Sequence, residues 1–207
     1  MNNHIKLYTV LFIVCLIAVF TSSCNGPSTR NQSLNANDTT HIEQFFHAFI
    51  SKHPNGLNND VLKEQMNKVF RNEIIDSLSK SSWLLEDYPI RLEQFKSLGN
   101  NKYSVHLQSW LHPDNFSFKD YDLHQLGFDI VGTTDSSYVN RLVEGNYYYI
   151  HGKLIRFISH QEFGYYTDHP AFTPSVGISK EIGSSTQLNM DMGEMLFEID
   201  SLTNYQK

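Results

Sequence analysis

The stretch that decides the fold reads Tyr103-Ser104-Val105-His106-Leu107-Gln108-Ser109-Trp110-Leu111-His112. Apolar side chains recur at every second position through most of this stretch, a period that is typical of a β-strand with one buried face. The chain before Pro89 has the helical period of 3.6 residues instead. Because helices come first and strands follow, the sequence predicts an α+β domain.

Two amphipathic helices are expected before Pro89. Thr40 and Glu43 have the S/T-x-x-E spacing of a capping box, so the first helix begins there. His53-Pro54-Asn55-Gly56 ends this helix, and a second one begins near Asn59 or Asp60. The apolar stripes are Ile42, Phe45, Phe46, Phe49 and Ile50 in the first helix, and Leu62, Met66, Val69, Phe70 and Ile74 in the second. The short link predicts an antiparallel helical hairpin.

A run of strands is expected after Pro89, with a tight hairpin turn at Asn100-Asn101. The expected strands are Ile90–Phe95, Tyr103–Leu111, Gly127–Thr133, Tyr138–Val143, Asn146–Ile158, Glu162–Thr167 and Val176–Ile178. The segment Met190–Ile199 is expected to close the core as a strand or a short helix. An open sheet of so few strands would leave both of its edge strands unpaired and exposed, which is unfavourable. We therefore expect the helical hairpin to pack on a curved or barrel-like antiparallel sheet.

The segment Val143–Leu154 bears on the kind of curved sheet. It has a turn glycine, Gly145, before a strand that runs through the pair Gly152-Lys153. This arrangement resembles the central hairpin of oligonucleotide/oligosaccharide-binding (OB) barrels, a likeness that covers only this segment. A cone-shaped sheet wrapped on the helices, as in cystatin-like or nuclear-transport-factor-like domains, fits the same order of elements. Both alternatives stay open on the sequence.

The first 24 residues have the order of an export signal. Lys6 supplies a positive charge, Leu7–Phe20 is apolar, and Thr21-Ser22-Ser23 precedes Cys24. A small-residue run that ends on Cys resembles the lipobox of bacterial lipoproteins, although Thr21 stands where that motif usually has Leu. The resemblance implies cleavage before Cys24 and acylation of its sulfur and its new amino group, with palmitate or a similar chain. A plain secreted protein and an uncleaved anchor are the alternatives.

These features predict three segments: a signal peptide over residues 1–23, a lipidated Cys24 with a flexible tether over 24–38, and a single α+β domain over 39–207. The tether is expected because residues 25–38 are polar and contain almost nothing that could enter a core. Cys15 would leave with the signal, so Cys24 would be the one cysteine of the mature chain. The expected location is the bacterial cell envelope, on a membrane through the lipid at Cys24.

Charge and motifs exclude several functions. The formal net charge of −6 disfavours nucleic acid, whose phosphates are bound by Lys and Arg. The chain has no H-E-x-x-H, C-x-x-C or G-x-S-x-G motif. His106 and His112 share one strand face, which we interpret as a solvated face rather than a metal site. Asp168-His169 and the scattered carboxylates form no recognisable catalytic set. We therefore expect no catalytic residue, metal or cofactor.

Aromatic side chains are the more suggestive feature of the strand region. Candidate ligand-binding residues are Trp110, Tyr147, Tyr148, Tyr149, Tyr165 and Tyr166. On a strand, Tyr148 must face opposite to Tyr147 and Tyr149. Tyrosine also simply favours strands, which is the plainer interpretation. The predicted function is a non-enzymatic binding or assembly module for a protein or a glycan. The alternative is a hydrolase of envelope polymers whose site is built from dispersed His and carboxylate residues.

Overall fold

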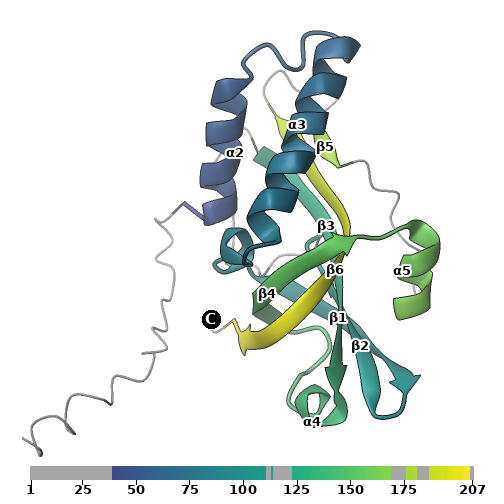
Figure 1. The fold of residues 1–207 in the computed structure, drawn as a ribbon. Coiled ribbons are helices and arrows are strands. Elements are labelled where there is room, and N and C mark those ends of the chain that lie inside the picture. Colours follow the sequence, from purple (N-terminus) through teal and green to yellow (C-terminus); the bar gives the residue numbers. More distant parts are fainter. Residues whose placement is uncertain (1–38, 111–112, 114–122, 169–175, 181–186, 206–207) are drawn as a thin grey trace, which may run out of the picture. The chain divides into compact units, whose positions relative to one another are not determined.

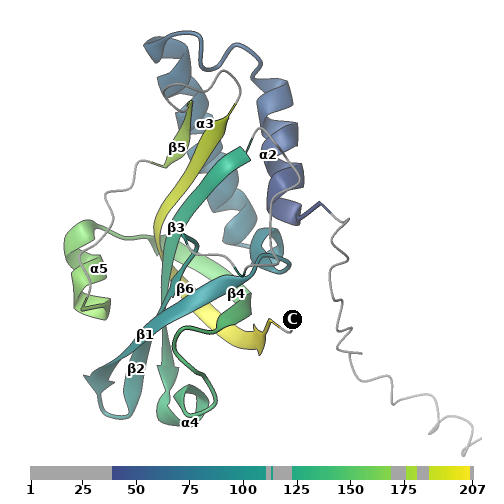
Figure 2. The same cartoon turned by 180° about the vertical axis from the view of Figure 1, so that it is seen from behind.

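The computed structural model describes residues 39–110, 113, 123–168, 176–180 and 187–205. All of them belong to one compact unit within residues 34–207. Cys24, the tether and His112 lie outside the described residues, as does His169. Figure 1 shows two long helices beside one end of a strongly curved sheet, and Figure 2 shows the same arrangement from behind.

The predicted helical hairpin is confirmed. Helix α2 (His41–Lys52) begins with the full capping box, in which Glu43 Oε2 accepts a hydrogen bond from Thr40 N at 2.8 Å. Helix α3 (Asp60–Leu78) begins at Asn59, whose side chain accepts from Leu62 N. The two helices lie side by side (Figure 1), and Phe49 of α2 meets Phe70 of α3 edge to face at 5.2 Å. A short 3-10 helix, η1 (Trp83–Leu85), leads from the hairpin to the sheet.

Six strands form one sheet: β1 (Ile90–Gly99), β2 (Lys102–Gln108), β3 (Leu123–Asp135), β4 (Tyr147–Phe157), β5 (Gly177–Lys180) and β6 (Leu188–Asn204). Their order is β3-β2-β1-β4-β6-β5, and β3 pairs with β6 as well. That additional pairing is parallel, whereas the other five are antiparallel. The fold is therefore α+β, with a helical hairpin on a curved and partly closed sheet. Closure is partial because β1 and β4 share only two residue pairs, Ile90↔Tyr148 and Arg91↔Tyr147.

Local signals in the sequence account for the tight features of the sheet. Asn100 and Asn101 have φ angles of 50° and 58°, so both central residues of the β1–β2 hairpin are left-handed, as a type I′ turn requires. Gly152 lies at a register shift where β4 crosses β6. A Cβ atom on Gly152 would lie 2.2 Å from the Glu198 carbonyl oxygen, so only glycine permits this approach of the two strands.

Two expected strands are helices instead. The expected strand Tyr138–Val143 is not extended: helix α4 (Ser136–Val139) includes its first two residues and a turn follows, because the Asp135 side chain caps the helix by accepting from Tyr138 N at 3.1 Å. Glu162–Thr167 lies almost wholly in helix α5 (His160–Tyr166), where Ser159 accepts from Glu162 N at 3.3 Å. In both places a capping side chain outweighs a short run of β-favouring residues. Of the two alternatives for Met190–Ile199, the strand is right.

The sheet has apolar side chains on both faces. The main core joins Phe46, Phe49 and Phe70 of the helices to Ile130 of β3 and Phe197 of β6. A smaller core on the other face holds Val131 and Ile158 under Phe163 of α5. Consecutive residues of β3 therefore serve different cores, as strand geometry requires.

The buried stripe of α2 gives the first prediction. Phe46 is fully buried in the main core. Phe46→Ala removes that contact and leaves a cavity, so we expect the free energy of unfolding to fall by about 3–5 kcal/mol. Urea denaturation monitored by circular dichroism measures the change. Val61→Ala is the control because Val61, on the second helix, is 64% exposed. Equal midpoints for the two variants would show that α2 contributes little to the fold.

Candidate functional site

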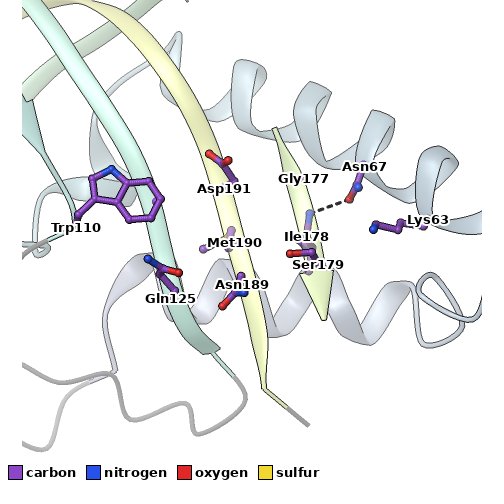
Figure 3. A pocket seen from close by; sticks show the side chains of 11 residues that line it. Lys63, Asn67, Trp110, Gln125, Gly177, Ile178, Ser179, Asn189, Met190 and Asp191 are labelled. Carbon is purple, nitrogen blue, oxygen red and sulfur yellow. Dashed lines mark hydrogen bonds between the residues drawn. The ribbon is translucent and has the colours of Figure 1, made fainter. Parts of the chain in front are cut away.

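A groove of about 400 Å³ lies between α3 and the surface of β3, β6 and β5 (Figure 3). We call it the Trp110 groove. Its polar and aromatic side chains are Lys63, Asn67, Trp110, Gln125, Ser179, Asn189 and Asp191. Two rows of register partners cross the three strands here. One row is Gln125, Asn189 and Ser179, and the other is Gly127, Asp191 and Gly177. Strand pairing therefore fixes most of the groove surface.

Trp110 forms one end of the groove. Its indole lies directly on the backbone of β3, because a Cβ atom on Gly127 would be 2.3 Å from the ring atom Cη2. Its Nε1–H donates to Asp129 Oδ2 at 3.5 Å. The absent side chain at Gly127 and this polar contact together hold the ring across β3, where Figure 3 shows it.

Asn67 approaches from α3 at the other side of the groove. Its Oδ1 accepts a hydrogen bond from Ile178 N of β5 at 2.8 Å (Figure 3). A Cβ atom on Gly177 would lie 2.6 Å from both Cγ and Nδ2 of Asn67, so glycine is required for this contact too. The bond fixes the amide plane, and the NH2 group lies against Gly177 of β5. Asn67 is thus a held donor at the edge of the groove.

Asn189 and Asp191 project from β6 between these two ends (Figure 3). The Oδ1 atom of Asn189 is buried and accepts no hydrogen bond from any residue that the structure describes. Asp191 Oδ1 accepts from Gly193 N at 2.8 Å, which fixes the carboxylate. One cation, Lys63, and one anion, Asp191, line the groove, so its formal charge is balanced.

Next to the groove, three ionisable side chains are buried on adjacent strands. His106 Nε2 lies 2.7 Å from Asp129 Oδ1, and both side chains are 3% exposed. Glu194 of β6 is the register partner of Asp129 and is 1% exposed. Burial, together with the charges of Asp129 and Asp191, raises the pKa of Glu194 to about 7. Trp110 connects this buried cluster to the groove through Asp129.

The interpretation of His106 as part of a solvated face is wrong. Helix α5 covers that part of the sheet, and Phe163 meets the His106 ring edge to face at 5.1 Å. Strand periodicity alone could not reveal this cover, because α5 comes much later in the chain. Among the described residues, no group of three or more His, Cys, Asp or Glu side chains is arranged to hold a metal ion.

The six candidate aromatic residues do not form one surface. Tyr148 is 1% exposed and its hydroxyl oxygen accepts from Val143 N at 2.8 Å, so it belongs to the core and not to a binding face. Tyr147 and Tyr149 face the other way, as alternation predicts, and Tyr149 packs edge to face on Tyr205 at 5.6 Å. Tyr165 and Tyr166 pack on each other in α5. Of the six, only Trp110 lines the groove.

The scattered carboxylates have structural partners. Glu144 Oε1 accepts from Phe95 N at 2.9 Å, and Glu162 forms an ion pair with Arg156. Asp168 is exposed and lies 3.1 Å from Lys96 Nζ. Asn67, Gln125, Asn189 and Asp191, which line the groove, were missed because isolated amides and carboxylates carry no motif. The positions of Gly127 and Gly177 on strands were the signal that could have pointed to close contacts there.

Comparison with known proteins gives no match: no family model, no curated protein and no solved structure is similar to the chain at a significant level. No helix within the described ranges is long and apolar enough to cross a membrane.

The raised pKa of Glu194 gives a prediction about stability. The folded protein retains the Glu194 proton up to about pH 7, whereas the unfolded chain releases it near the ordinary value of 4.5. The free energy of unfolding should therefore fall as the pH rises from 4.5 through 7, by on the order of 1–3 kcal/mol. Glu194→Gln has no proton to lose, so we expect a smaller fall and greater stability than the wild type at pH 8.

Urea denaturation at pH 5 and pH 8 measures this effect. Glu198→Gln is the matched control, because Glu198 is an exposed residue of the same strand that pairs with Lys153 at 2.8 Å. A Glu194→Gln protein whose stability changes with pH as much as that of the wild type would show that another group titrates.

Proposed function

We propose that this protein is a lipid-anchored component of the bacterial cell envelope whose domain is a non-enzymatic binding module for a glycan or a protein. The Trp110 groove is the observation that carries the proposal. It presents one aromatic ring, several amides and one side chain of each charge, from helix α3, the residues after β2 and three paired strands. Concave sites with a few fixed polar groups are typical of ligand recognition.

Burial of the ionisable cluster favours binding over catalysis. His106, Asp129 and Glu194 resemble the dispersed His and carboxylate residues of the alternative, a hydrolase. A general acid or base must come within about 3 Å of the proton that it transfers. These three side chains are at most 3% exposed, and Phe163 and the Trp110 indole pack on them. This arrangement is better suited to holding the groove residues in place than to catalysing hydrolysis of a polymer.

The strand connectivity supports the likeness to OB barrels. The ring of pairings runs β1-β2-β3-β6-β4 and returns to β1, and its one parallel pairing joins β3 to the last strand. If the short β5 is regarded as an insertion, this is the connectivity of a five-stranded OB barrel, and an open cone-shaped sheet has no such ring. OB barrels commonly bind oligosaccharides and oligonucleotides. The net charge of −6 disfavours the second class.

The lipid anchor rests on the sequence of residues 1–24. Two or three acyl chains at one cysteine give stable membrane attachment, because each buried methylene contributes about 0.8 kcal/mol. The polar residues 25–38 would then set the domain at a distance from the bilayer on the order of 20 Å.

The proposed lipid anchor is tested by the variant Cys24→Ala. We expect this variant to lose incorporation of labelled palmitate and to leave the membrane fraction or remain unprocessed. Metabolic labelling and membrane fractionation measure both effects, and Cys15→Ala is the matched control. If the wild-type protein takes up no label and both variants fractionate with it, the protein is not a lipoprotein of this kind.

The binding part predicts the behaviour of Trp110→Ala. Full-length protein in detergent is immobilised and exposed to envelope extract that has been separated into glycan and protein fractions. We expect one component to bind the wild type and to bind Trp110→Ala at least tenfold more weakly, since an aromatic anchor commonly contributes 2 kcal/mol or more.

Tyr165→Ala is the control for this experiment, because Tyr165 is 61% exposed and lies outside the groove. Equal binding by all three proteins would exclude the groove as the binding site. New reducing ends in the glycan fraction would support the hydrolase instead.

A further inference from the structure

We propose that the ligand of the Trp110 groove is a neutral carbohydrate, one or two pyranose rings long, with one ring lying on the indole. This inference rests on the binding role proposed above and names the ligand class.

The aromatic end of the groove suits a sugar ring. A pyranose has C–H groups on its faces and hydroxyl groups around its rim, so it can stack on an aromatic ring while its rim stays polar. Trp110 lies against the backbone of β3 because Gly127 has no side chain. Asp129 fixes the indole from its nitrogen side at 3.5 Å. A ring held in this way loses little conformational entropy on binding.

The rest of the groove suits the hydroxyl rim. Each sugar hydroxyl is both a donor and an acceptor, so it can satisfy an amide from either side. Asn189 is partly exposed at the centre of the groove, where it pairs with Gln125 of β3 and Ser179 of β5. Asn67 offers an NH2 group whose orientation is fixed by its bond to Ile178 N. Gln125, the register partner of Asn189, is exposed beside it.

Volume and charge limit the ligand further. A cavity of about 400 Å³ is near the lower end of the range for small-molecule sites, roughly 300–1,000 Å³. This size suits one or two rings rather than a long polymer segment. Among the lining residues that the structure describes, Lys63 and Asp191 are the ionised side chains, so neither sign of charge is in excess. A lining without an excess of either charge favours a neutral ring over a strongly charged one.

An extended peptide fits less well. Peptides commonly bind by adding a strand to a free sheet edge, through a row of main-chain hydrogen bonds. The edge strand here is β5, which has four residues. The Ile178 N–H on its outer side already donates to Asn67 Oδ1. Helix α3 therefore occupies the edge at which a peptide would pair.

The two tryptophans of the chain make a direct test possible. In a Trp83→Phe background, the single remaining indole Nε1–H signal in the NMR spectrum belongs to Trp110. Full-length protein in detergent is titrated with N-acetylglucosamine, chitobiose, cellobiose and maltose. We expect at least one of these sugars to shift this signal saturably, with a Kd of roughly 10 mM or tighter, as is usual for weak single-site binding.

Substitutions then assign the contacts. Asn189→Leu keeps the shape of the side chain and removes both hydrogen-bonding groups, so we expect a Kd at least tenfold higher. Gln125→Leu, at an exposed position, is the second variant in case Asn189→Leu does not fold. Tyr165→Ala should leave the Kd unchanged.

Two results would overturn the inference. One is the absence of any saturable shift with all four sugars up to about 50 mM, well beyond the millimolar range that corresponds to about −4 kcal/mol. The other is a saturable shift with tetra-alanine and none with a sugar, which would assign the groove to a protein partner. In either case the proposed binding role would still stand if an envelope protein bound the immobilised wild type and bound Trp110→Ala more weakly. Loss of both kinds of binding would contradict the two proposals together.

Discussion

The parallel pairing of β3 with β6 is the constraint on which the rest of the structure depends. It joins residues 123–132 to residues 188–197 and turns an open row of strands into a partly closed sheet. The same pairing places Asn189 beside Gln125 and Asp191 beside Gly127, so it builds the centre of the groove. It also sets Glu194 beside Asp129 in the buried cluster. One set of backbone hydrogen bonds thus determines core closure, the groove and the buried charges.

The free-energy cost of burying these ionisable groups is reduced by their neighbours and by protonation. An isolated carboxylate in a core would lose several kcal/mol of hydration. Asp129 keeps a close partner in His106, and Glu194 holds its proton until the pH nears neutrality. Replacing such a cluster with apolar residues often stabilises a protein. Its presence beside Trp110 therefore suggests that it orients the indole, which an apolar core could not do through a hydrogen bond.

Much of the fold followed from local patterns in the sequence. The capping box at Thr40, the breaker at Pro54 and the double asparagine turn at Asn100 each act within a few residues, so the chain around them suffices. Helices α4 and α5 were mistaken for strands because capping by Asp135 and Ser159 competes with β-favouring residues. The period of the apolar residues, on which the strand predictions were based, contains no information about capping side chains. The β3–β6 pairing could not be derived, since its partners are far apart in the chain.

The site could be predicted only in part. Trp110 was a candidate because it is aromatic and lies near strands, and the structure places it in the groove. Tyr148 was a candidate for the same reason, yet it is buried. Alternation showed that it faces opposite to its neighbours, but which of the two faces meets the core depends on the helices above the sheet. Asn67 reaches the groove from a helix, and no strand pattern could have included it.

The long separation in sequence between β3 and β6 has a consequence for synthesis. Until Leu188–Asn204 emerges from the ribosome, β3 and β4 each lack the partner that covers one of their edges. Long-range pairings of this kind form slowly, because a large loop must close first. The sheet therefore cannot close before β6 has been synthesised. That delay suits a protein that, as we propose, is threaded across a membrane before it folds.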